Sequence, residues 1–348
     1  MNCTTNKAKT LKAPPPAHMK ISRRALLMSP LVALAGGLLG SILAKYKHLT
    51  MRSDVFVAKV GDYAQDISSV IVSAMAELGL THTEIVGKRV LLKPNLVEVI
   101  KGSTHINTHP LVIRGAIDAF LKLGASKVIV GEAQGHVRDS HYVLEESGVA
   151  DVLFEDRTPF IDLNNDALFT VPNKSGVSNL KTLSFPRTLK QVDMIVSLAK
   201  MKTHHWTGVT LSMKNMFGIM PGIVYGWPKN ILHHAGIGQS IIDINTTFPP
   251  HFAIVDGIVG MEGDGPIMGT PCPSGVLVMG RNLPAVDATC SRIMGIDPAR
   301  IKYLKAASYH LGPIKEKYIE QRGESISSVH KNFSLLNNIP AHKRIRLG

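Results

Sequence analysis

The chain has 348 residues, a hydrophobic fraction of 45% and a formal net charge of +13 at pH 7. This hydrophobic fraction excludes wholesale disorder, and roughly 300 residues beyond the N-terminal region suffice for one large domain or two closely joined domains. Aromatic residues make up only 5% of the chain and are not interleaved with basic residues, which argues against nucleic acid as a partner. Residues 1–44 contribute six of the positive charges, so the body carries +7, which suits an acidic small molecule or an anionic membrane surface.

Residues 1–44 have the pattern of a twin-arginine export signal. An Arg23-Arg24 pair precedes an apolar run that ends at Ala44, and no acidic residue occurs in this segment. We therefore expect the twin-arginine translocase as a partner and a periplasmic or otherwise exported location. Because this route carries folded proteins, we expect the chain to fold before export. The stretch 25–44 is about long enough to span a bilayer, so an uncleaved signal would tether the protein to the inner membrane. An ordinary signal anchor that carries two arginines is the alternative.

Beyond a linker at residues 45–53, apolar strands alternate with amphipathic helices. The pattern predicts strands at residues 55–60, 89–92, 127–130, 194–198, 252–255 and 276–279. It predicts helices at residues 67–78, 110–123 and 285–294, with Thr108 as a cap of the second. This alternation is typical of an α/β fold with a mostly parallel, doubly wound sheet flanked by helices. We expect this domain at residues 54–312, an irregular, loop-rich insertion that acts as a binding loop or lid at 201–235, and a weakly packed basic tail at 313–348.

Three sequence blocks in this domain are distinctive when taken together. The first is Leu91-Leu92-Lys93-Pro94-Asn95-Leu96 with Thr108-His109-Pro110 and Gly124-Ala125-Ser126-Lys127-Val128-Ile129-Val130-Gly131-Glu132. The second is Lys200-Met201-Lys202-Thr203-His204 with Lys214-Asn215-Met216-Phe217-Gly218. The third is Val255-Asp256-Gly257-Ile258-Val259-Gly260-Met261-Glu262-Gly263-Asp264-Gly265-Pro266 with Ala285-Val286-Asp287-Ala288. Over most of residues 55–310 the chain resembles the family named domain of unknown function 362. The resemblance implies an α/β fold and little about chemistry.

Some relatives in that family carry a fused ferredoxin-type module, which implies electron transfer for those members. Here only Cys272 and Cys290 lie beyond the leader, whereas a cubane cluster takes four cysteines. We therefore expect no iron–sulfur cluster from this chain alone. We expect both thiols to be free, with a single disulfide between them as the alternative.

Polar side chains follow the predicted strand ends, which is where open parallel sheets bind ligands. Ammonium groups supply point charges and amides supply further donors, so such a set can hold a phosphate or a carboxylate. The residues that we expect to bind an anionic small molecule are Lys93, Asn95, Lys200, Lys214 and Asn215. A solvated basic loop is the alternative.

Histidines beside this set are candidates for acid–base catalysis. We expect His204 and His233, together with Lys202, to form the catalytic set, because imidazole exchanges protons near neutral pH. The Lys-x-Thr-His, Lys-Asn and His-His segments are also loosely similar to the lactate racemase family. That similarity implies hydride or proton transfer at the carbon α to a carboxylate.

Three carboxylates lie close together in a glycine-rich stretch. Asp256, Glu262 and Asp264 could converge on a divalent cation such as magnesium or calcium, which is the cofactor that this pattern suggests. The alternatives are a carboxylate that acts as a general base, and an Asp256 that caps a turn.

Together these features predict a metal- or cofactor-assisted enzyme that acts on an anionic small molecule. The alternative is a non-catalytic periplasmic binding or accessory protein for an acidic ligand or a metal. An electron-transfer-associated protein ranks third, because the cluster ligands are missing from the sequence.

Overall fold

The computed structural model describes residues 51–136 and 139–348, which belong to one compact unit that spans residues 45–348. The expected signal at residues 1–44 and most of the expected linker lie outside the described residues. Within the described ranges, none of the helices combines the length and the apolarity that crossing a membrane requires.

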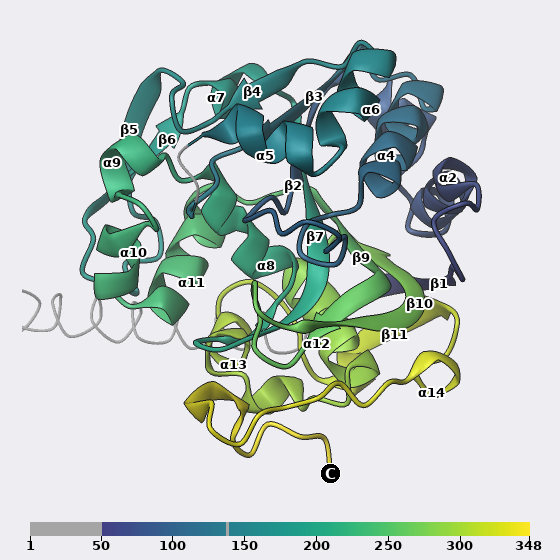
Figure 1. Cartoon of the computed structure of the whole chain (residues 1–348), viewed down its shortest axis with the longest axis vertical. Helices are drawn as coiled ribbons and strands as arrows, with labels where there is room; N and C mark the ends of the chain where they lie inside the picture. Colours follow the sequence, from purple (N-terminus) through teal and green to yellow (C-terminus); the bar gives the residue numbers. More distant parts are fainter. Residues whose placement is uncertain (1–50, 137–138) are drawn as a thin grey trace, which may run out of the picture. The chain divides into compact units, whose positions relative to one another are not determined.

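A mostly parallel sheet of nine strands runs through the described chain (Figure 1). In spatial order its strands are β11 (Ile319–Gly323), β1 (Ser53–Lys59), β10 (Thr270–Gly280), β9 (Phe252–Glu262), β7 (Met194–His204), β2 (Arg89–Pro94), β3 (Lys127–Glu132) and β4 (Phe160–Asp162), with β8 (Gly208–Thr210) paired to β7. The neighbours from β9 to β4 are parallel, as are β1 and β11, whereas β10 is antiparallel to both of its neighbours. A separate hairpin pairs β5 (Leu168–Pro172) with β6 (Thr182–Pro186). The predicted α/β class is confirmed.

Helices pack on both faces of this sheet. Side chains alternate along each strand, so Val90 and Leu92 belong to one core cluster and Leu91 to the other. The first cluster is covered by α2 (Ile67–Glu77), α4 (Pro110–Lys122), α5 (Ser140–Glu146) and α6 (Val149–Glu155). The second is covered by α8 (Ser212–Asn215), α11 (Ile237–Thr247), α12 (Leu283–Ile293) and α13 (Lys302–Ala307).

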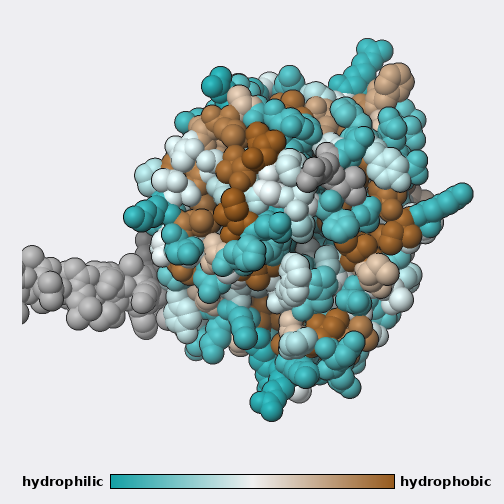
Figure 2. All heavy atoms as spheres, turned by 60° about the vertical axis from the view of Figure 1, so that its left-hand side comes forward, coloured by the Kyte–Doolittle hydropathy of each residue, from teal (hydrophilic) through white to brown (hydrophobic). Residues whose placement is uncertain are grey.

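Short helical turns fill the connections between these larger elements. They are α3 (His82–Ile85), α7 (Thr188–Gln191), α9 (Gly222–Tyr225), α10 (Asn230–His234), α14 (Ile326–Val329), η1 (Met216–Ile219), η2 (Pro298–Arg300), η3 (Glu316–Tyr318) and η4 (Pro340–His342). The predicted irregular segment 201–235 therefore contains β8, α8, η1, α9 and α10. On the surface, apolar side chains lie in patches among polar ones (Figure 2).

Two central strands are longer than the sequence predicts. β7 continues to His204 and β9 continues to Glu262, so polar residues expected in loops lie inside the sheet. The strands can continue because the polar groups find partners there: Lys200 and Asp256 occupy facing positions and form an ion pair of 2.8 Å. Buried charges persist in proteins when they are paired in this way.

The segment 313–348 is an integral part of the domain and not the weakly packed tail that we expected. Its strand β11 pairs with β1, and Phe333 is fully buried in the core. The polar and basic composition of this segment concealed a few well-spaced apolar side chains, which suffice to anchor it. The two described cysteines, Cys272 and Cys290, are free thiols, as expected.

Candidate functional site

A cavity of about 330 Å³ lies at the carboxyl ends of β2, β3 and β7, beneath the short helices of residues 201–235. Open parallel sheets bind ligands at this edge. Of the residues predicted for catalysis and ligand binding, those that line the cavity are Lys93, Asn95, Lys202, His204, Lys214, Asn215 and His233. The structure therefore brings together side chains that are far apart in the sequence, and adds Glu132, Thr210 and Lys229 to them.

Asp287 of α12 holds the short helix α8 in place at the cavity. Its carboxylate accepts hydrogen bonds from the backbone N–H of Ser212 (2.8 Å), from the Ser212 hydroxyl (2.6 Å) and from the backbone N–H of Met213 (3.1 Å). The residue before α8, Leu211, has no polar side chain that could cap the helix. Asp287 therefore accepts the hydrogen bonds of the first N–H groups of α8 in its place. This contact positions Lys214 and Asn215. Burial raises the pKa of Asp287 to about 7.

A buried hydrogen-bond network forms one wall of the cavity. The Lys93 ammonium donates to the Glu132 carboxylate, to the carbonyl of Pro94 and to Oδ1 of Asn215 (2.8 Å). These acceptors use all three of its donors, so Lys93 adds charge and rigidity but no free hydrogen bond. The Asn215 amide N–H groups are also used, by the Lys93 carbonyl and by Ser197 (both 3.0 Å). Burial raises the pKa of Glu132 and lowers that of Lys93, and their ion pair opposes both changes.

Three further lysines carry donors that the described protein atoms do not fully use. Lys202 donates to two backbone carbonyls (2.8 and 3.1 Å), and Lys229 to Oδ1 of Asn164 (3.0 Å) and to one carbonyl. Each therefore keeps one N–H without a partner among the described residues. The Lys214 ammonium lies 4.1 Å from the centre of the Phe217 ring, with no hydrogen bond to the described chain. These groups give the cavity a cationic character with spare donors.

Burial lowers the pKa of all three of these ammonium groups. It takes the pKa of Lys214 to about 8 and that of Lys229 to about 7, and it places that of Lys202 well below its usual value. Lys93 adds repulsion at each position, and Glu132 partly offsets it. Because an anion in the cavity would favour the charged forms, it would raise these pKa values and draw protons from solution.

Two buried oxygens on the cavity wall have no partner among the described residues. They are Oδ1 of Asn95 and Oγ1 of Thr210, whose residues are 7% and 4% exposed. Buried polar atoms in proteins are nearly always hydrogen-bonded. A bound molecule that carries a donor group would satisfy both oxygens, and the Thr210 hydroxyl could also donate.

The two predicted catalytic histidines have opposite tautomers in the cavity. Nδ1 of His204 accepts the backbone N–H of Trp206 (3.0 Å), which places the proton of the neutral ring on Nε2. Nδ1 of His233 lies 3.0 Å from the Lys229 carbonyl and must donate to it, which leaves Nε2 of His233 unprotonated. Burial lowers the pKa of His204 well below its usual value and that of His233 to about 4, so both rings are neutral at pH 7.

The three predicted metal ligands have separate partners. Asp256 pairs with Lys200, the Glu262 carboxylate accepts a backbone N–H from the C-terminal segment (2.8 Å), and Asp264 lies 3.7 Å from His205. Across residues 51–136 and 139–348, no group of three or more His, Cys, Asp and Glu side chains is placed to hold a metal ion. The carboxylates diverge because β9 runs through Glu262, where the sequence suggested a turn.

Lys200 lies outside the cavity in a second buried cluster. Its ammonium donates to Asp256 (2.8 Å) and to the Tyr63 hydroxyl (3.0 Å), and the Tyr63 ring stacks on His109 at a centroid distance of 3.6 Å. His109 caps α4, the role predicted for Thr108, whose hydroxyl donates to a carbonyl of β7 instead. Burial raises the pKa of Tyr63 and lowers that of His109 to about 4. This cluster therefore connects β7, β9 and the start of α4. Lys200 does not line the cavity.

The sequence did not indicate Thr210 or Lys229, and it indicated Glu132 only as a polar residue at a strand end, with no role assigned to it. Glu132 follows the third predicted strand, so the strand-end rule indicates its place but not its pairing with Lys93. Thr210 and Lys229 lie in the segment 201–235, where no periodicity shows which side chains turn inward. Lys229 also has a left-handed backbone (φ 69°), a conformation that costs a residue with a side chain about 1–2 kcal/mol. No local sequence pattern predicts this conformation.

The fold and the site define an α/β protein with a cationic cavity at the carboxyl edge of a mostly parallel sheet. The family model described as "Domain of unknown function (DUF362)" matches residues 90–292, and the chain belongs to this family. All of the residues that line the cavity fall within the matched segment. The site is therefore built from the part of the chain that the family shares.

A thylakoid-associated protein of Synechocystis is 28% identical to this chain over 233 residues, which are 65% of this chain and 68% of that protein. A solved structure of a protein from Thermotoga maritima has 17% identity and a TM-score of 0.38, and covers 67% of this chain and 60% of its own. The lactate racemase apoprotein from Thermoanaerobacterium thermosaccharolyticum has 12% identity and a TM-score of 0.42, with 71% and 58% covered. This chain thus matches less than two thirds of either solved structure.

Proposed function

We propose that this protein is an enzyme that binds a small carboxylate in the cationic cavity and transfers a proton at the carbon α to the carboxylate. One observation carries the proposal: the cavity combines ammonium groups that have spare donors with two neutral histidines of opposite tautomer. A site that only bound an anion would need the charges but not the complementary imidazoles.

The lysines supply the electrostatic part of this chemistry. Removal of an α proton from a carboxylate develops a second negative charge on its oxygens, and preorganised donors in a buried site stabilise such a charge. Lys214, Lys202 and Lys229 have the spare N–H groups for this role. Their pKa values are lowered by burial, and a bound anion would raise them, so binding would increase the positive charge of the cavity.

The histidines supply the proton-transfer part. Nε2 of His233 has a free lone pair and would accept the proton and later return it, while the Nε2–H of His204 would donate a hydrogen bond to a substrate oxygen. Burial lowers the pKa of His233 to about 4, which makes the ring a weak base. A carboxylate close to the ring would raise that pKa, so the basicity of His233 depends on the substrate.

Deuterium incorporation tests this proposal. A panel of small 2-hydroxy carboxylates is incubated with the protein in D₂O, and exchange of the α proton is followed by proton NMR. We expect exchange with wild type, a loss of 10²-fold or more in His233→Gln, and no change in His234→Gln, which alters an exposed neighbour. Binding of these anions without exchange by wild type would replace the proposal with the non-catalytic binding protein.

We also propose that the protein is exported through the twin-arginine translocase. The proposal is supported by the Arg23-Arg24 pair before an apolar segment. Cell fractionation of wild type and of a variant with both arginines changed to lysine tests it. We expect the periplasm or the inner membrane for wild type and the cytoplasm for the variant. An unchanged distribution would contradict the twin-arginine route.

A further inference from the structure

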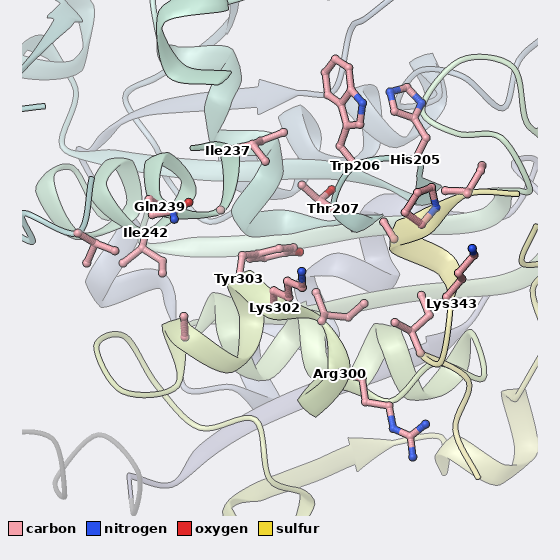
Figure 3. Close-up of a pocket in the computed structure, with 18 of the residues that line it drawn as sticks. His205, Trp206, Thr207, Ile237, Gln239, Ile242, Arg300, Lys302, Tyr303 and Lys343 are labelled. Carbon is pink, nitrogen blue, oxygen red and sulfur yellow. The ribbon is translucent and has the colours of Figure 1, made fainter. Parts of the chain in front are cut away.

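A second, larger cavity of about 890 Å³ adjoins the cationic cavity. The two cavities share His205 and Trp206 in their linings, so these two side chains stand between them. Figure 3 shows both residues beside the larger cavity, with Tyr303 extended across it. A molecule held in one cavity is therefore adjacent to the other.

The larger cavity is mainly apolar. Its walls come from α11, from α13 and from the C-terminal segment, and its apolar side chains include Ile237, Ile242, Ile301, Ala306, Ile339 and Ile345. A volume of this size accommodates an extended hydrocarbon chain, whose burial removes apolar surface from water. Basic side chains of Arg300, Lys302 and Lys343 also lie on its lining.

One buried polar atom in this cavity lacks a partner among the described residues. It is the hydroxyl of Tyr303, a residue that is 3% exposed and whose ring lines the cavity. A buried phenol hydroxyl normally makes a hydrogen bond. An oxygen atom along the chain of a bound molecule would accept one here.

We propose that the substrate is an amphipathic anion whose carboxylate occupies the cationic cavity and whose apolar chain extends past Trp206 into the larger cavity. This inference rests on the proposed function and names its substrate class. The two linings decide the orientation. The cavity with the buried lysines and their spare donors takes the head group, and the isoleucine-lined cavity takes the chain, since its basic side chains are exposed to solvent.

The two cavities differ in how much of their lining falls within the segment that the family model matches. The cationic cavity lies wholly within residues 90–292, whereas the larger cavity is closed by residues 300–345 beyond the matched segment. The shared segment would provide the chemistry and this chain's C-terminal part would select the substrate. The exposed Trp206 ring, at 59%, provides an apolar surface at the junction.

The test measures affinity for straight-chain carboxylates from butanoate to decanoate by calorimetry, below their micelle concentrations, with the full chain. We expect the affinity to rise by up to about fourfold per added methylene. Ala306→Phe, which fills the larger cavity, should weaken decanoate at least tenfold and leave butanoate unchanged. Ala76→Phe makes the same change at an exposed site on α2 and should alter neither. Tyr303→Phe should preserve the chain-length dependence, because these probes carry no oxygen along the chain.

The other outcomes of this experiment separate failure of the inference from failure of the proposed function. If butanoate binds but affinity does not grow with length, the inference is overturned and the proposed function stands. If no carboxylate binds at any length, the proposed function fails as well. If decanoate binds equally well to Lys214→Met, the larger cavity binds apolar molecules independently of the cationic one, which also overturns the inference. A flat series together with a dimer that Ala306→Phe disrupts would assign the larger cavity to a second copy of the chain.

Discussion

Lys229 makes the stability of this protein depend on pH. Its ammonium is 3% exposed, and burial lowers its pKa from 10.5 to about 7. Between these two values the unfolded chain holds a proton at this site that the folded chain does not. Stability therefore rises with pH across this window, because the unfolded state binds more protons. The difference between 10.5 and about 7, at about 1.36 kcal/mol per pKa unit, sets an upper limit of about 5 kcal/mol.

Lys229→Met removes this titration and nearly preserves the side-chain volume. Urea unfolding at several pH values between 6.5 and 10 gives the free energy of unfolding for wild type, for this variant and for Lys305→Met, which removes an exposed lysine. We expect the stability of wild type relative to Lys229→Met to increase by about 3–5 kcal/mol over this range. Lys305→Met should follow wild type. Parallel curves for wild type and Lys229→Met would refute a buried Lys229 with a lowered pKa.

Two further substitutions test the scaffold of the site. Gly218→Ala should destabilise the protein by about 1–3 kcal/mol in urea unfolding, because the added Cβ would collide with the Glu132 carboxylate. Gly61→Ala is the control, since a Cβ at position 61 has room and should have little effect. Equal effects of the two substitutions would contradict the tight packing at Gly218. Asp287→Ala should cost about 2–4 kcal/mol and also weaken carboxylate binding, because it releases α8 with Lys214. Asp243→Ala removes a similarly bonded buried carboxylate that does not line the cationic cavity, and it should destabilise the protein without changing its affinity for butanoate. Calorimetry that finds the same loss of butanoate affinity in both variants would contradict the role of Asp287.

Strand positions and the location of the site follow from the sequence because both depend on local pattern. Apolar runs bounded by turn residues mark the strands, and the strand-end rule points to Lys93 and Asn95. The length of β7 does not follow, because a strand with lysines at 200 and 202 continues only if distant residues supply partners for them. The carboxylate of Asp256 is one such partner, and nothing in its own surroundings reveals the pairing.

The metal prediction shows the same limit. Asp256, Glu262 and Asp264 are close in sequence, but an extended β9 separates their side chains and gives each a different partner. Proximity along the chain indicates a shared site only when the backbone turns. The C-terminal segment shows the converse, since the burial of Phe333 depends on the surface that the rest of the fold presents to it.

The central claim is that the cavity binds a carboxylate through Lys214 with uptake of protons. Calorimetry with butanoate at pH 7.5, in two buffers of different ionisation enthalpy, measures affinity and proton uptake together. We expect net proton uptake by wild type and about 10–100-fold weaker binding by Lys214→Met. Lys190→Met removes another ammonium that lies 4.1 Å from a phenylalanine ring centre, and should bind as wild type does. Equal affinity of wild type and Lys214→Met, or binding without proton uptake, would contradict the account.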